Sequence, residues 1–185
     1  MFRRLIVSLV LSLSLLVGIG CGARIYNVTP VPSSAPASEA GNEQGVIAKT
    51  AILDGDQTLD RFEANLPLAG VIAIEVQINN RTSETVKADS LKFELRDAGG
   101  NLKQIVPSKA LKRVMKFYGN SFYRKDAKVN TFKSYEDIGL PTHSAIAPQS
   151  ELRGFLFYET QINRTSISGL TFSVGGATKQ INVTN

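Results

Sequence analysis

The residue types that most often perform catalysis or bind metals are scarce in this chain of 185 residues. It contains one cysteine, Cys21, and one histidine, His143. A nucleophilic triad needs a histidine between a nucleophile and an orienting acid, and the sequence contains no Gly-x-Ser-x-Gly turn to present a serine. Transition-metal sites usually require several His or Cys ligands. We therefore expect no catalytic triad, no metal and no cofactor, and we interpret His143 as a loop residue.

Two groups of acidic residues could suggest a carboxylate site. Glu136 and Asp137 are adjacent, and paired carboxylates hydrolyse glycosidic bonds when both face the substrate. Neighbours on a strand point to opposite faces, so adjacency alone does not predict a catalytic pair. The segment Asp54-Gly55-Asp56, with Asp60, lacks the spacing of an EF-hand calcium loop, and we interpret it as a turn.

The position of Cys21 predicts export. Arg3 and Arg4 precede an apolar run, Leu5–Val17, which is interrupted only by serines and is followed by small residues. This run is shorter than the about 20 apolar residues of a spanning helix, and its flanks are those of a signal peptide. We predict that residues 1–20 are removed. Losing the two arginines lowers the formal net charge of +5, and the mildly basic remainder does not indicate nucleic-acid binding.

The segment Val17-Gly18-Ile19-Gly20-Cys21 resembles the lipobox of bacterial lipoproteins. In that family the cysteine thiol receives diacylglycerol, the chain is cut before the cysteine, and the new amino group is acylated with a chain such as palmitate. Gly20 supplies the small residue before the cut, whereas Gly18 stands where the family prefers leucine. The resemblance implies lipidation of Cys21 in the cell envelope. Gly22 is not the aspartate that favours inner-membrane retention, so the outer membrane is expected.

The anchor would be followed by a tether and one folded domain. Residues 21–45 are rich in Pro, Ser, Gly and Asn, which cannot build a core. A flexible chain of this length spans about 25–30 Å, so the domain at residues 46–185 can stand away from the bilayer.

Hydrophobic alternation from Val46 onward predicts a mainly β domain. Turn residues such as Gly99-Gly100 and Gly175-Gly176 separate the apolar runs and predict hairpins. The predicted strands cover residues 46–53, 70–79, 91–97, 102–106, 152–159, 169–174 and 179–183.

The alternation is broken between Pro107 and Tyr118, where we predict one short helix. Ser108 is its expected N-cap, and Gly119-Asn120 is its expected end. Its apolar residues recur at helical spacing, at Ala110, Leu111, Val114, Met115 and Tyr118. Residues 120–150 are the least regular part of the chain, and no element is predicted there.

Seven or eight short antiparallel strands with one inserted helix predict a β-sandwich. Three segments resemble small immunoglobulin-like domains of bacterial surface lipoproteins: Asn79-Asn80-Arg81-Thr82 after an alternating strand, Phe93 in the next strand, and Arg153-Gly154-Phe155-Leu156-Phe157. The resemblance covers about residues 70–159. It implies an immunoglobulin-like fold and carries no active site.

Residues 109–133 combine basic and aromatic side chains. Eight basic residues lie in this segment against one acidic residue, Asp126. Such a patch can attract anionic lipid headgroups, an acidic glycan or an acidic protein. The simpler interpretation is a solvated helix face and loop. The candidate binding residues are Lys109, Lys112, Arg113, Lys116, Arg124 and Lys125.

Together these patterns predict a non-enzymatic, lipid-anchored envelope module that binds or scaffolds another envelope component. Nucleic acid is not an expected partner in that compartment. Two alternatives stay open: a hydrolase of envelope polymers that uses Glu136 or Asp137, and a purely structural spacer. A concave pocket with convergent acids would favour the hydrolase, and a convex basic patch would favour binding.

Overall fold

The computed structural model describes residues 38–41, 45–119, 125–141, 143–161, 167–174 and 177–181. The predicted signal peptide, Cys21, most of the predicted tether, Arg124 and the expected turn at Gly175-Gly176 lie outside these ranges.

The described chain is mainly β, and its strands pair antiparallel. One sheet has the strand order β1-β2-β3-β9-β7, a second has the order β11-β10-β5-β6, and β4 pairs with β8 alone. In chain order the strands are β1 Ser38–Gly41, β2 Val46–Ile52, β3 Val71–Asn80, β4 Val86–Lys87, β5 Leu91–Asp97, β6 Gly100–Asn101, β7 Lys103–Ile105, β8 Ala145–Ile146, β9 Ser150–Glu159, β10 Ile167–Val174 and β11 Ala177–Ile181.

The five-stranded and four-stranded sheets share one hydrophobic core. Ile74 and Ile78 of β3, Leu95 of β5, and Leu170 and Phe172 of β10 are all buried in it. On β5 buried and exposed residues alternate along the whole strand, which confirms the pattern predicted from the sequence. Strands β1 and β11 also lie close together, at one edge of each sheet.

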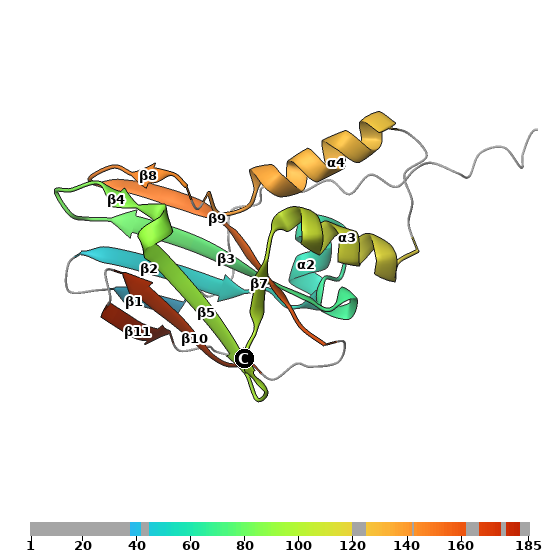
Figure 1. Ribbon diagram of the computed structural model, residues 1–185, viewed down its shortest axis with the longest axis horizontal. Helices are drawn as coiled ribbons and strands as arrows, with labels where there is room; N and C mark the ends of the chain where they lie inside the picture. The colour runs from blue at the N-terminus through green and yellow to red at the C-terminus, as the bar shows by residue number, and fades with distance from the viewer. Residues whose placement is uncertain are drawn as a thin grey trace, which may run out of the picture.

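The other face of the five-stranded sheet is covered at one end by helices, which in the described part of the chain are α2 (Gly55–Phe62), α3 (Pro107–Phe117) and α4 (Lys125–Asp137). Figure 1 shows the helices gathered at this end, with β4 and β8 at the opposite end. A second core forms beneath them from Phe62, Leu111 and Tyr135 of the helices and Phe157 of β9. The prediction of a single inserted helix is therefore wrong.

The prediction of a turn at Asp54-Gly55-Asp56 is also wrong, because Asp54 is the N-cap of α2. Its carboxylate accepts a hydrogen bond from the Gln57 N–H at 2.8 Å, and the Gln57 side-chain oxygen accepts one from the Asp54 N–H at 3.0 Å. This reciprocal pair is a capping box, which satisfies two backbone N–H groups at the helix start. Asp54 therefore has a structural role.

Helix α3 confirms the predicted helix but not the predicted cap. Val106 occupies the N-cap position without a side-chain bond, and Pro107 begins the helix, where its missing N–H costs nothing. Gly119 follows the helix in the left-handed region, with φ of +64°. Helix α4 lies in the stretch where no element was expected.

Two strands depart from the expected pairing. The return strand after β5 pairs with β5 only through β6 and the hydrogen bond from the Leu102 N–H to the Leu95 carbonyl at 2.8 Å, and β7 then pairs with β9 in the other sheet. At the start of the domain, Ser38–Gly41 of the predicted tether pair with β2 as strand β1. The sheet thus begins earlier than the expected domain.

Candidate functional site

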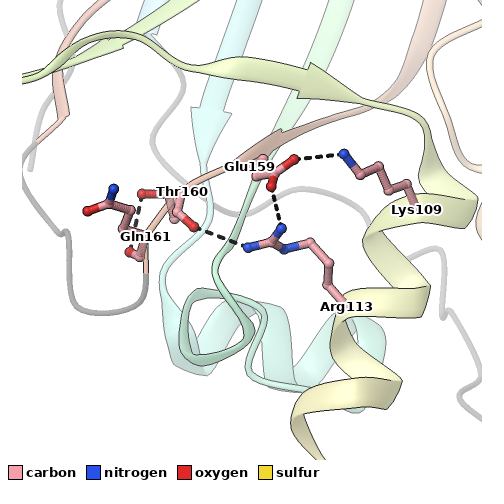
Figure 2. A network of polar contacts seen from close by, with 5 residues as sticks. All are labelled: Lys109, Arg113, Glu159, Thr160 and Gln161. Carbon is pink, nitrogen blue, oxygen red and sulfur yellow. Dashed lines mark hydrogen bonds and ion pairs between the residues drawn. The ribbon is translucent and has the colours of Figure 1, made fainter.

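The basic side chains of α3 fall into two groups, and the first group contacts β9. The Glu159 carboxylate accepts hydrogen bonds from Lys109 Nζ at 2.8 Å and from Arg113 Nη1 at 2.5 Å. Figure 2 shows both cations reaching from successive turns of α3 to the two oxygens of Glu159. Arg113 Nη2 also donates to the Thr160 carbonyl at 3.4 Å. Two cations of α3 therefore hold the helix against the end of β9.

This cluster keeps Glu159 ionised. The hydrogen bond from Lys109 is the largest cause that lowers the pKa of Glu159, and the positive charges of Arg113 and Lys109 act in the same direction against partial burial. The Glu159 side chain is 31% exposed, so water screens both ion pairs. Glu159 was not among the candidate residues predicted from the sequence, because the pattern of a strand does not indicate ion-pair partners about fifty residues away.

The second group is the exposed surface of the C-terminal half of α3, which we call the outer face and define as Lys112, Lys116 and Phe117. Phe117 is the last residue of the helix and lies about 100° around its axis from Lys116. The two lysines are exposed and lie one turn apart on the same side of the helix. Phe117 is 44% exposed, and its ring packs perpendicular to that of Tyr118 with centroids 4.9 Å apart. Tyr118 in turn accepts a hydrogen bond from the Asn65 N–H at 3.1 Å, which fixes this end of the helix.

The basic stretch does not continue evenly into α4. Lys125, Lys128 and Lys133 are balanced by Asp126, Glu136 and Asp137 in that helix. The structure describes the backbone of Lys125 but not its side chain, and Arg124 lies outside the described residues. Among the side chains that the structure describes, the exposed cationic surface therefore lies on α3.

A groove of about 570 Å³ lies where the first turn of α3 meets the last turn of α4. Glu136 and Asp137 both border it, because they end a helix and are not on a strand as the opposite-face argument assumed. His143 lies in a turn, as expected, and borders the same groove. The lining residues include Val106, Pro107, Ser108, Glu136, Asp137, Gly139, Leu140, Pro141, His143, Ser144 and Arg153.

The groove depends on a close backbone approach to β9, where Gly139 and Phe155 form an isolated parallel bridge. The Phe155 N–H donates to the Ile138 carbonyl at 2.8 Å, and the Leu140 N–H donates to the Phe155 carbonyl at 2.9 Å. A Cβ at Gly154 would lie 2.5 Å from Leu140 Cα. Glycine at this position lets the segment approach, and so brings the end of α4 beside the start of α3. A glycine inside a strand pattern is the sequence signal for such an approach.

Arg153, which borders the groove, is already engaged. It donates to Glu151 within β9, and this hydrogen bond is the main cause that raises the pKa of Arg153. Deeper under the helices, Arg61 of α2 lies 3.3 Å from Glu75 of β3, and both side chains are largely buried. The Arg61–Glu75 pair fixes α2 to β3.

No family model matches this chain, and no curated protein matches its sequence. Within the described ranges, no group of three or more His, Cys, Asp or Glu residues is arranged to hold a metal ion. None of the helices in the described part of the chain combines the length and the apolar character needed to cross a membrane.

Proposed function

We propose that this chain is an exported lipoprotein of the bacterial cell envelope, anchored through Cys21, with the outer membrane favoured. Its folded domain binds or scaffolds an anionic envelope component and catalyses no reaction. The observation that carries the binding proposal is the division of cations on α3. Lys109 and Arg113 are bound to Glu159, whereas Lys112 and Lys116 are exposed to solvent beside the half-exposed ring of Phe117.

We also propose that the domain is immunoglobulin-like. Two antiparallel sheets that share one core, with alternate residues of β5 facing inward, support this proposal. The helices over the outer face of the five-stranded sheet would then be an addition to that architecture.

The proposed lipid anchor at Cys21 is tested by comparing the intact mass and detergent partitioning of the native protein with those of a Cys21→Ala variant. The expected mature mass begins at Cys21 and includes acyl chains, and the variant loses both the acyl mass and the detergent partitioning. An unmodified chain in the aqueous phase would overturn the anchor and leave an unanchored β domain.

The binding surface is tested by reversing both exposed charges in a K112E/K116E variant. We expect the variant to lose lipids or acidic partners that co-purify with the wild type, because the local potential changes sign. The matched control is K87E/K92E, which reverses two exposed lysines of β4 and β5. If the co-purifying material is the same in all three proteins, the structural spacer is the better hypothesis.

A second candidate is hydrolysis of an envelope polymer, and one observation favours it. Glu136, Asp137 and His143 border one groove, and a hydrolase of this kind needs its acid and base to line a common groove. Release of reducing ends from purified envelope glycan by the wild type, and its loss in E136Q or D137N, would replace the binding proposal. Equal background in all three proteins would remove the hydrolase.

A further inference from the structure

We propose that the outer face of α3 docks on the membrane surface that holds the lipid anchor, with anionic phospholipid headgroups as the ligand. This inference rests on the proposed function, because it takes Cys21 as the anchor. It adds the identity of the ligand and the orientation of the domain.

The length of the linking chain keeps the domain close to the bilayer. Residues 22–37 separate Cys21 from the first residue of β1. Even fully extended, a chain of that length spans at most about 50–60 Å. An interaction with the same bilayer is then intramolecular in character, so a weak contact is sufficient to hold the domain down.

The charge at this end of the molecule suits a headgroup layer. Each basic residue near an anionic surface raises binding by about fivefold. Lys112 and Lys116 present two such residues on one side of α3. Neither lysine is drawn into the cluster around Glu159, so both charges remain available to a ligand outside the domain.

Two exposed apolar side chains lie near the C-terminal end of α3, where Phe117 directly follows Lys116. Phe117 is 44% exposed and Leu68 is 48% exposed. Asn65 links the two, since its N–H bonds the Tyr118 hydroxyl next to Phe117 and its side-chain oxygen accepts from the Leu68 N–H. Cations beside exposed apolar groups are typical of interfacial segments.

The size of the patch favours a bilayer over a protein partner. A stable protein complex usually covers about 800 Å² on each partner, which is far more than two lysines and two apolar side chains supply. An anchored domain has no such requirement, because the anchor has already removed most of the entropic cost of association.

The neighbouring helix fixes the expected orientation. Asp54, Asp56 and Asp60 are exposed on α2 and at its N-cap, and an anionic surface repels them. Gly55, between Asp54 and Asp56, lies against Asn65, so the repulsion acts on the Leu68 side of the surface. The closest contact with the bilayer should therefore be made by the lysines and Phe117 of α3.

The absence of tryptophan from the sequence offers a direct probe. Phe117→Trp places a single tryptophan in the proposed contact, and Val106→Trp places one at the other end of α3, where Val106 is 62% exposed. Each full-length lipidated variant is reconstituted into vesicles of phosphatidylcholine, with or without phosphatidylglycerol, that contain brominated lipid. Circular dichroism checks that both variants fold.

We expect brominated lipid in anionic vesicles to quench the indole of the Phe117→Trp variant and to leave that of the Val106→Trp variant largely unquenched. Replacing Lys112 and Lys116 by glutamine should weaken the docked state by about 25-fold, the product of two fivefold effects. High salt should release it as well.

The failures are distinguishable. The second readout is a vesicle flotation assay. If the protein floats with anionic vesicles but the indole of the Phe117→Trp variant is quenched no more than that of the Val106→Trp variant, the docking proposal is wrong and the proposed anchor stands. If the protein does not float with vesicles, the anchor is wrong and the docking inference falls with it. If the indole of the Phe117→Trp variant is shielded only after envelope proteins are added, the ligand is a protein and the inference is overturned.

Discussion

A buried hydroxyl ties the two sheets together. The Tyr158 hydroxyl, on β9, donates to the Phe93 carbonyl of β5 at 2.9 Å. Burial raises the pKa of Tyr158, because the charged phenolate would lie in the core between the sheets. The bond satisfies a backbone carbonyl near the edge of β5, where β6 covers only the last two residues of the strand.

Tyr158→Phe should lower the free energy of unfolding by about 1–2 kcal/mol at neutral pH, since the Phe93 carbonyl then lacks its partner. The pKa of Tyr158 is raised in the folded state, so its stabilising effect is complete below the usual tyrosine pKa of 10.0 and is lost as the pH rises above it. Urea unfolding of both proteins at pH 7 and above pH 10 measures the change. A difference that stays constant with pH would contradict this account.

Gly154 is the second residue whose identity is dictated by a neighbour. Gly154→Ala places a Cβ 2.5 Å from Leu140 Cα and 2.7 Å from its nitrogen, and backbone atoms cannot move as a side chain can. We expect a loss of about 1–3 kcal/mol in the free energy of unfolding, measured by chemical denaturation. The control is Gly169→Ala on β10, where the nearest atom is the end of the Gln180 side chain at 3.4 Å. Equal losses in both variants would remove the explanation.

At the scale of elements, the attachment of α3 to β9 rests on an ionised carboxylate. Glu159→Gln should lower the free energy of unfolding by less than about 1 kcal/mol, because the ion pairs are partly exposed. The pKa of Glu159 is lowered in the folded state, so this contribution is present above the ordinary glutamate value of 4.5 and is lost as the pH falls through the folded pKa.

Denaturation at pH 7 and in strong acid, at low and high salt, measures the Glu159 contribution. Glu94→Gln is the matched control, because its partner Arg96 lies 3.8 Å away and both side chains are about half exposed. A Glu159→Gln effect that persists unchanged in acid would show that charge is not its cause.

The helices differ in how far the sequence could predict them. Helix α3 has its buried residues Ala110, Leu111 and Val114 at helical spacing, and it was predicted. The buried face of α2 includes Thr58 and Arg61, so the sequence does not show apolar residues at helical spacing there. The residues of its N-cap also resemble a turn in sequence. Helix α4 is polar along most of its length and buries Thr131 and Tyr135 under tertiary contacts that no local pattern reveals.

At the scale of the whole molecule, the five-stranded sheet belongs to both cores. One face contacts the second sheet and the other contacts the helices. We therefore expect cooperative unfolding. Phe62→Ala in the helical core and Phe172→Ala in the core between the sheets should each cost about 3–5 kcal/mol, and each should shift far-ultraviolet circular dichroism and tyrosine fluorescence together. Separate melting of the helices would contradict this expectation.

The alternation of β3 and β5 was sufficient to predict a mainly β, antiparallel chain. It could not show that β7 changes sheets, because that choice depends on which strand edge is open in three dimensions. The groove could not be predicted for a similar reason: Ser108, Glu136 and Arg153 come together only because residues 138–140 pair with β9 beside Gly154. The helical period in the sequence predicted which lysines of α3 are exposed. It could not predict that Lys109 and Arg113, unlike Lys112 and Lys116, are bound to a carboxylate, because that carboxylate is Glu159 on another element.

Because a core lies on each face of β3, the positions in this strand differ in the substitutions that they tolerate. Val71–Ile74 are buried in succession, whereas from Glu75 to Asn80 partly exposed and buried positions alternate. A polar residue introduced anywhere in the first stretch would face a core, and Glu75 is held by its largely buried pair with Arg61. In a collection of functional variants, Val71–Glu75 should appear uniformly intolerant, and substitutions should be accepted at Gln77 and Asn79.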